Sequence, residues 1–260
     1  MTFLLRIFVR MGITSMLMVA PTVVAAQVAP ALPELRFQVE KFKLDNGMTV
    51  LLSADHSVPS ISYQTWFRVG SRDETEGMTG IAHLFEHLMF KGTPKYNGKE
   101  MERVLQANGA NLNAFTTHDY TGYYIDIPSS KLSLVMDIEA DRMVNLVVDE
   151  PNLQSEREVV KEERRFRVDN SPTGVLSEAT FKSVFRQLPY KWPIIGWMDD
   201  INRLTLKACR EFYRTYYAPN NAVLVIVGDI NIDKTKSMVR KYYGGLKAQS
   251  LPQRNYPIEP

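Results

Sequence analysis

The stretch from Gly80 to Phe90 is apolar on nearly every side when it is drawn as a helix. Its large apolar residues cover most of the cylinder: Ile81, Leu84, Phe85, Leu88 and Met89. A helix of this kind is stable only inside a fold. His83 and His87 are four residues apart, which places them about 40° from each other, and Glu86 follows on the same side. Because unpaired polar groups are costly to bury, the stretch predicts a buried helix that carries a metal site.

A second interpretation of these histidines stays open. A buried histidine can be held by a hydrogen bond to a neighbouring side chain instead of by a metal. The chain has four histidines, and the other two are weak candidates for ligands. His56 lies in a polar loop, and His118 lies in a predicted turn. Cys209 is the only cysteine, so neither an intrachain disulfide nor a cluster of thiolate ligands is possible.

Composition narrows the class of protein. The chain has 260 residues and a net charge of +2, with no basic run and no acidic tail, so nothing indicates a nucleic-acid partner. The length fits one large domain or two small ones. Residues 1–26 have the pattern of a secretory signal peptide: Arg6 and Arg10, then an apolar run, then small residues up to Ala26. We therefore expect an exported protein, periplasmic or secreted, with an uncleaved membrane anchor as the alternative.

The rest of the chain predicts an α+β fold with a mainly antiparallel sheet flanked by helices. Residues 27–36 contain two prolines and are expected to form a linker. Asn46-Gly47 is a strong hairpin signal. Strands are expected at 37–44, 48–53, 60–69, 111–115, 120–127 and 222–227. Helices are expected at 99–107, 129–147 with Ser129 as its cap, 152–168, 171–185, 206–217 and 233–243. The aromatic segment 187–200 is expected to be an ordered loop that packs against the domain, with a position beside the substrate as the alternative.

The predicted helix over 152–168 offers a third metal ligand. Glu156 and Glu163 are seven residues apart, so they lie within about 20° of each other on the stripe that also bears Val159 and Val160. Glu158, Lys161, Glu162 and Arg165 point the opposite way. A core-facing carboxylate needs a cation to stay ionised. The alternative to a metal is an ion pair with a buried arginine such as Arg142.

The spacing H-x-x-E-H with an acidic residue 76 positions after the second histidine resembles the pitrilysin/insulysin family of zinc metallopeptidases, which includes the mitochondrial processing peptidases. The resemblance extends over residues 37–246 and is carried by residues 80–93, 109–116, 156–163 and 217–229. It implies that residues 37–247 form the N-terminal peptidase domain of that family, the half that carries the zinc. It also implies that residues 248–260 begin a linker to a second half.

The resemblance implies an activity and assigns roles to residues. His83, His87 and Glu163 would bind one Zn²⁺, and Glu86 would take a proton from the zinc-bound water and return it to the leaving amine. Glu156 would support the site. The matching edge strand, which would hold an extended peptide by its backbone, contains Asn113, Ala114 and Phe115. The expected function is that of a zinc-dependent endopeptidase acting on extended peptides or unfolded segments.

The family usually has a second homologous half or subunit, which supplies an Arg-Tyr pair that helps hold the substrate. We expect this chain to bind zinc alone and to cleave peptides poorly until that half is supplied. One alternative is a non-catalytic subunit of a peptidase heterodimer. Another is an enzyme like S-ribosylhomocysteine lyase, which would need a cysteine as its third ligand, and Cys209 is the one available.

Overall fold

The computed structural model describes residues 38–260, so the predicted signal peptide and the linker at 27–36 lie outside the described residues. The described residues form one compact unit. Within the described part of the chain, no helix combines the length and the apolar character that a membrane span requires.

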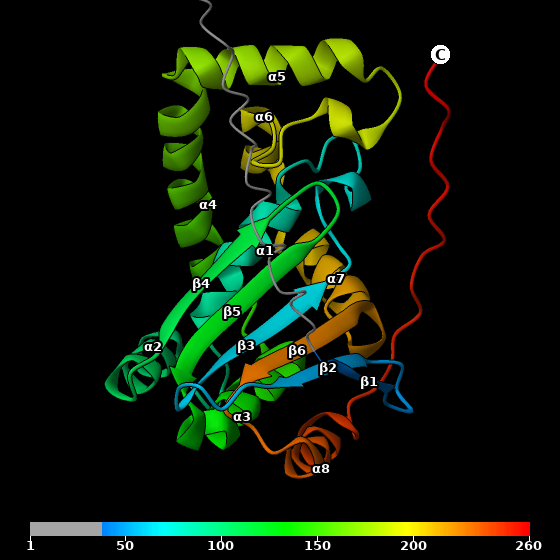
Figure 1. Ribbon diagram of the computed structural model, residues 1–260. Coiled ribbons are helices and arrows are strands. Elements are labelled where there is room, and N and C mark those ends of the chain that lie inside the picture. The colour runs from blue at the N-terminus through cyan, green and yellow to red at the C-terminus, as the bar shows by residue number, and fades with distance from the viewer. Residues whose placement is uncertain (1–37) are drawn as a thin grey trace, which may run out of the picture. The chain divides into compact units, whose positions relative to one another are not determined.

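A six-stranded sheet forms the frame of the unit, and it confirms the expected mainly antiparallel α+β fold (Figure 1). Its strands are β1 (Glu40–Lys43), β2 (Thr49–Ala54), β3 (Ser60–Phe67), β4 (Asn111–Thr116), β5 (Thr121–Pro128) and β6 (Ala222–Gly228). They lie in the order β1-β2-β6-β3-β5-β4, and only β2 and β6 are parallel. The predicted turn joins β1 to β2 through Gly47, whose φ of 89° favours glycine. β6 is the last strand along the chain, but it lies inside the sheet, between β2 and β3.

The helices follow the predicted order with differences at their ends. They are α1 (Ile81–Leu88), α2 (Gly98–Ala107), α3 (Leu132–Asn145), α4 (Glu150–Arg164), α5 (Pro172–Val184), α6 (Met198–Arg203), α7 (Leu206–Tyr216) and α8 (Ile232–Tyr243). Short 3₁₀ turns occur at Ser71–Asp73, Met89–Lys91, Ser129–Lys131, Pro189–Lys191 and Pro219–Asn221. The expectation of a loop over all of 187–200 was wrong at its end, because α6 begins at Met198.

Two other local expectations were wrong. Ser129 does not cap α3, because a 3₁₀ turn precedes that helix and the Ser129 hydroxyl donates to Asp229 Oδ2 at 3.0 Å. The helix expected over 152–168 changes its winding: α4 ends at Arg164 and continues as a π-helical turn over Arg165–Asp169. Such turns are rare, and they frequently occur at functional sites.

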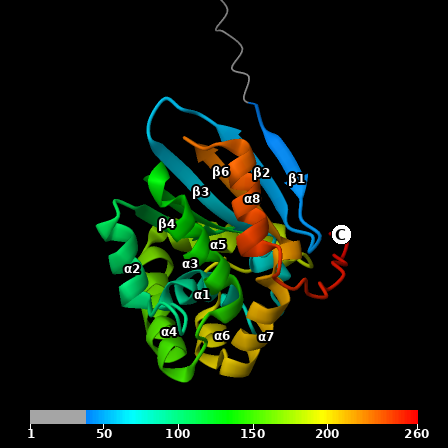
Figure 2. The same ribbon diagram turned by 90° about the horizontal axis from the view of Figure 1, so that it is seen from below.

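One face of the sheet is buried beneath the helices. Along β3, Ile61, Tyr63 and Phe67 are buried, whereas Trp66 on the opposite face is half-buried. Helices α1, α3 and α7 lie on the buried side in both ribbon views (Figures 1 and 2). The alternation of side chains along a strand thus separates a core face from an outer face.

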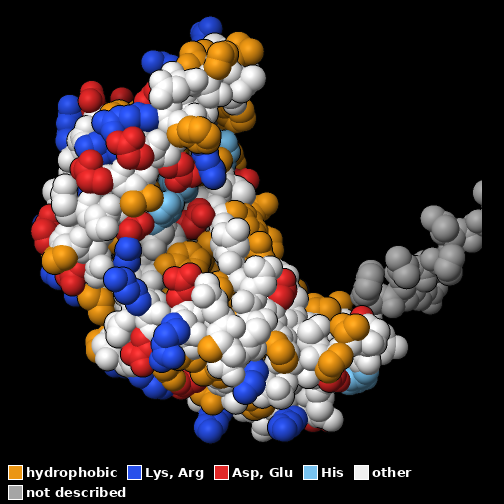
Figure 3. Space-filling model, turned by 90° about the vertical axis from the view of Figure 1, so that its left-hand side faces the viewer, with side chains coloured by type: hydrophobic (Ala, Val, Ile, Leu, Met, Phe, Trp, Pro, Cys, Tyr) orange, Lys and Arg blue, Asp and Glu red, His pale blue; other side chains and the backbone are white. Residues whose placement is uncertain are grey.

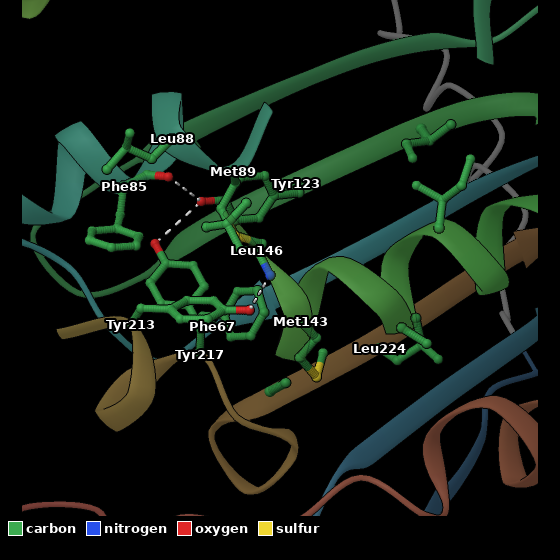
Figure 4. Packing of buried hydrophobic residues seen from close by; sticks show 14 of the residues in the cluster. Phe67, Phe85, Leu88, Met89, Tyr123, Met143, Leu146, Tyr213, Tyr217 and Leu224 are labelled. Atoms are coloured by element: carbon green, nitrogen blue, oxygen red, sulfur yellow. Dashed lines mark hydrogen bonds between the residues drawn. The ribbon is translucent and has the colours of Figure 1, made fainter. Parts of the chain in front are cut away.

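Helix α1 is buried in the centre of this layer, as its sequence predicts. Leu84, Phe85 and Leu88 have no exposed surface. The Phe85 ring is stacked on Tyr213, with 6.0 Å between centroids, and the Tyr123 hydroxyl on β5 donates to the Phe85 carbonyl at 3.4 Å (Figure 4). Tyr213 also accepts the backbone N–H of Leu146 at 3.1 Å. These contacts hold α1 between the sheet and α7.

Helix α4 packs against α1 and begins with a strong cap. The Asp149 side chain accepts the backbone N–H of Asn152 at 3.0 Å, and Pro151 occupies the first turn, where its missing N–H costs nothing. The cap thus fixes the N-terminal end of α4, the helix that packs against α1.

The segment expected to begin a linker, 248–260, has no regular secondary structure and runs along one side of the domain (Figure 1). Arg254 forms an ion pair with Asp73 at 2.6 Å. The Glu259 carboxylate accepts the N–H groups of Gln187 and Leu188 at 2.9 and 2.6 Å. Residues 248–260 are therefore tied to the turn at Ser71–Asp73 and to the loop after α5.

Candidate metal centre and active site

Three potential ligand atoms converge between α1 and α4. Glu163 Oε2 lies 3.3 Å from His87 Nε2 and 3.6 Å from His83 Nε2. Ligands about 2.0–2.1 Å from a tetrahedral Zn²⁺ lie about 3.3 Å from one another, so these separations fit zinc. Nδ1 of His83 is buried and has no hydrogen-bond partner among the described residues, so the ring is held by no hydrogen bond at that nitrogen. Two imidazoles and a carboxylate are a donor set that zinc prefers, and each imidazole must be neutral when it binds the metal.

The environments of the two histidines differ in charge. Burial lowers the pKa of His83 to about 4, which keeps its imidazole neutral. Burial also disfavours the charged form of His87, but the hydrogen bonds that its ring donates to Glu156 and Glu163 outweigh it and raise the pKa of His87 to about 9. The hydrogen bond from His87 is the main cause that lowers the pKa of Glu163. The site thus attracts positive charge to the space between these side chains.

Glu156 lies behind His87 and contacts it through the ring nitrogen that faces away from Glu163. Its Oε2 is 3.2 Å from His87 Nδ1, and its Oε1 forms an ion pair with Lys91. Burial favours the protonated carboxyl, but His87 and Lys91 outweigh it and lower the pKa of Glu156. A carboxylate in this position fixes the tautomer and the orientation of a metal-binding histidine.

Glu86 is on the same stripe of α1 and is held by the neighbouring strand. Thr116 at the end of β4 donates its hydroxyl to Glu86 Oε2 at 2.7 Å. Burial raises the pKa of Glu86, although the bond from Thr116 opposes that shift. A carboxylate with a raised pKa is suited to accept and return protons near neutral pH.

The side chains of His83, Glu86, His87 and Glu163 open into one cleft of about 870 Å³. Its lining comes from α1, β4, α4 with the π-helical turn, and the segment Pro193–Ile195: His83, Glu86, His87, Asn113, Ala114, Phe115, Thr116, Val159, Glu162, Glu163, Phe166, Arg167, Val168, Pro193, Ile194 and Ile195. In the space-filling view, histidine side chains lie among acidic ones in a hollow of this face (Figure 3). β4 is the last strand of the sheet, and its outer edge has no strand partner among residues 38–260.

The structure gives each candidate from the sequence a position. His83, Glu86, His87, Glu156 and Glu163 lie together as the two helix stripes predict. The three β4 residues line the same cleft.

Other expectations about side chains were wrong. Val159 on the same stripe is exposed in the cleft, whereas Val160 is fully buried. The alternative partner Arg142 does not reach Glu156 or Glu163, because it forms a buried ion pair with Glu139 at 2.8 Å one turn away on α3.

The remaining candidates lie elsewhere. His56 contacts Asp229 at 2.7 Å, and His118 is stacked on Phe181. Cys209 is buried on α7 and is not among the three residues whose ligand atoms converge. In the aromatic segment, Trp192 packs inward and donates to the Ser71 carbonyl at 2.8 Å, whereas the three residues that follow it border the cleft. Packing against the domain thus holds for Trp192, and a position beside the substrate stays a prediction for the three residues that border the cleft.

Sequence reasoning missed several side chains of the site. Lys91 and Thr116 lie within the motifs that carry the family resemblance, but their contacts with Glu156 and Glu86 depend on packing between elements. Arg167 contacts Glu163 Oε1 at 3.0 Å from one turn further along. The exposed Phe166 beside it lines the cleft. No periodicity of the sequence indicates the π-helical turn that bears these two residues.

Comparison with protein-family models gives two matches. The model described as insulinase (peptidase family M16) matches residues 49–196, which is more than half of the chain. The model described as the peptidase M16 inactive domain matches residues 203–260.

Individual proteins also match this chain. A zinc protease, PqqE of Helicobacter pylori, is 38% identical over 209 residues, which are 80% of this chain and 47% of that protein. The crystal structure of a protease from Helicobacter pylori matches with a TM-score of 0.80 and 36% identity, over 86% of this chain and 54% of that one. The periplasmic protease PqqL from Escherichia coli shares the fold, with a TM-score of 0.78 and 24% identity, over 86% of this chain and 26% of that one. The chain thus spans about half the length of the curated relatives that it matches.

Proposed function

Because this chain belongs to the insulinase family (peptidase family M16), we propose that it is a zinc-dependent endopeptidase that hydrolyses extended peptides or unfolded segments. The observation that carries the proposal is the convergence of His83, His87 and Glu163 within one cleft, beside the carboxylate of Glu86. The predicted membership of a zinc metallopeptidase family is confirmed. The roles of the individual residues below are part of the proposal.

The three ligand residues would hold one Zn²⁺, which when bound polarises the scissile carbonyl and makes water acidic enough to lose a proton near pH 7. Glu86 accepts that proton from the attacking water and passes it to the leaving amine. Thr116 holds the Glu86 carboxylate toward the cleft through the bond at 2.7 Å. Glu156 orients the His87 ring from behind.

The substrate would bind as an extra strand along β4. An exposed strand edge offers unpaired backbone groups, which give affinity to an extended peptide irrespective of its side chains. Asn113, Ala114 and Phe115 lie on this strand and line the cleft, so a bound peptide would pass over Glu86. Most backbone groups of a folded protein are already paired, so extended or unfolded segments are the substrates that suit this edge best.

The test is the variant Glu86→Gln. It keeps the shape of the side chain and the three ligands, so zinc content should stay at one per chain while peptide cleavage is lost. Glu158→Gln is a matched control, because Glu158 lies on α4 with an exposed side chain and pairs with Lys161 at 3.1 Å. Full peptidase activity of purified Glu86→Gln would overturn the assignment of the base.

We further propose that full activity requires a second homologous half or a partner subunit that supplies an Arg-Tyr pair. The support is that the chain spans about half the length of its curated relatives. Residues 37–247 would then be the peptidase domain and 248–260 the start of the connection. Zinc binding by the isolated chain with slow peptide turnover is the expected result. Rapid turnover by a strictly monomeric chain would contradict this requirement.

A second candidate function is that of a non-catalytic subunit that keeps the fold. The match of residues 203–260 to a family model described as an inactive domain favours it. The Glu86→Gln comparison separates the two, because a non-catalytic subunit has no peptidase activity for the substitution to remove.

We propose export to the periplasm, or secretion, on the basis of the N-terminal pattern in residues 1–26. The periplasmic protease PqqL from Escherichia coli, which shares the fold, is consistent with it. Sequencing the N-terminus of the protein recovered from the producing cell tests this. A chain that begins at residue 27 is expected, and a cytoplasmic chain that begins at Met1 would contradict it.

A further inference from the structure

We infer that Glu74 is a positioning residue, which sets the N-terminal end of α1 and thereby the location of the ligands and the base on that helix. The inference rests on the proposed function. The Glu74 carboxylate accepts two backbone N–H groups: that of Gly80 through Oε2 and that of Ala82 through Oε1, both at 2.9 Å. The side chain is buried, with 6% of its surface exposed. His83 directly follows Ala82 along the chain.

These two bonds replace a cap that α1 cannot make for itself. The first N–H groups of any helix lack partners inside the helix. The residue at the cap position is Gly80, which has no side chain to accept them. A carboxylate is the strongest acceptor for this end, because the helix dipole places partial positive charge there. Among the ion pairs of residues 38–260 none includes Glu74. Burial is the largest influence on this carboxyl and raises its pKa, whereas the N–H groups of Ala82 and Gly80 oppose that shift.

A close backbone contact explains why a glycine occupies the cap position. Gly80 has a φ of 87°, and a Cβ there would lie 2.6 Å from the carbonyl oxygen of Ile195. On the same side, the Thr79 hydroxyl donates to Asp200 Oδ2 at 2.7 Å and accepts the N–H of Trp197 at 2.9 Å. The end of α1 therefore sits between the carboxylate of Glu74 and the segment before α6.

The consequence for the site follows from the shortness of α1. The helix rises about 1.5 Å per residue, so Ala82 and His87 are only about 7.5 Å apart along its axis. A shift at Ala82 would therefore move both imidazoles and Glu86 relative to Glu163, which belongs to a different helix. Glu74 touches none of these side chains, and its effect passes through the backbone of α1.

The test compares Glu74→Gln with Glu76→Gln. The glutamine places an NH₂ group against one of the two N–H groups, so one bond is lost without a change of shape. Glu76 is in the same loop with 87% of its side chain exposed, and its replacement controls for charge. We expect Glu74→Gln to weaken zinc binding and to lower kcat by about tenfold each, with KM unchanged, and Glu76→Gln to leave all three unchanged.

A second variant, with a melting temperature lowered as much as that of Glu74→Gln, separates a positioning role from a general loss of stability. Val239 is fully buried on α8 and belongs to neither α1 nor the cleft lining, so Val239→Ala lowers the melting temperature without displacing α1. If Glu74→Gln and Val239→Ala have similar melting temperatures and also share the same zinc affinity and kcat, the inference is overturned. If Glu74→Gln does not fold, Glu74→Asp decides: its carboxylate is one methylene too short to span both N–H groups, and parental zinc affinity would overturn the inference.

The zinc measurement does not depend on peptide cleavage, so it also separates the two proposals. A chain that binds zinc without cleaving peptides would refute the peptidase and leave the role of Glu74 testable by zinc affinity.

Discussion

Replacing Glu156 by Gln tests how the protein prepares His87 for a metal. Glu156 has 7% of its surface exposed and lies between two positively charged or donating groups, His87 Nδ1 at 3.2 Å and the ammonium of Lys91. Glutamine keeps the volume but removes the charge. Lys91 is then left without its neutralising partner, and the His87 ring loses the carboxylate that holds its Nδ1 proton.

The expected loss of zinc affinity follows from the position of Glu156, which contacts the proposed ligand His87 rather than the metal itself. Loss of such a partner typically weakens metal affinity by about 10–100-fold, which corresponds to about 1.4–2.7 kcal/mol. At saturating zinc, the folded state loses the same amount of stabilisation, because the metal binds the folded state only. For a domain of this size, that loss lowers the zinc-bound melting temperature by about 3–10 °C.

The assay is a zinc titration against a competing chelator, with thermal unfolding measured with and without zinc. Glu158→Gln, on the exposed face of the same helix, should match the parent protein. Lys91→Met should weaken zinc binding too, and the double variant should lose less than the sum, because both act through one carboxylate. A Glu156→Gln protein with the affinity of the parent would refute the assignment of Glu156 as the support of His87.

Three further predictions concern other parts of the structure. Thr116→Val removes the bond of 2.7 Å to Glu86, so kcat should fall about tenfold while zinc content is unchanged, and an unaltered kcat would show that Glu86 needs no such holder. Phe166→Ala should raise KM for peptides several-fold with little change in melting temperature, because 80% of this cleft residue is exposed, and an unchanged KM would remove it from the substrate path. Burial raises the pKa of the Cys209 thiol to about 12, so its contribution to stability is complete below about pH 8.5, the pKa of an unfolded thiol, and is lost as pH rises toward 12. Between pH 8 and pH 10, urea unfolding should show the parent losing about 2 kcal/mol more than Cys209→Ala, and parallel pH curves would contradict this.

Local periodicity was enough to bring the candidate site residues together. The four-residue spacing of His83 and His87 and the seven-residue spacing of Glu156 and Glu163 each place side chains on one stripe, whatever the rest of the fold does. A buried stripe of polar groups then requires a partner, and the two stripes supply it to each other across α1 and α4. The same reasoning predicted the burial of Leu84 and Phe85.

Partner choice over long distances was decided by the tertiary structure. Glu156 and Glu163 on α4 were possible partners for Arg142. Arg142 is buried on α3 instead, where it pairs with Glu139 of the same helix. Val159 faces the cleft because α4 rotates its stripe toward α1 and leaves one flank open. The insertion of β6 between β2 and β3 depends on pairing between segments about 170 residues apart, which no local pattern encodes.

The sequence by itself determined which atoms are available to bind a metal and to move a proton, because those depend on residue type and on the pitch of a helix. Only the tertiary structure decided how they are held. Lys91, Thr116 and Glu74 act through contacts between elements that the chain brings together by folding. The buried helix with two histidines therefore predicts a metal site, and the loop, strand and helix packed around it decide its geometry.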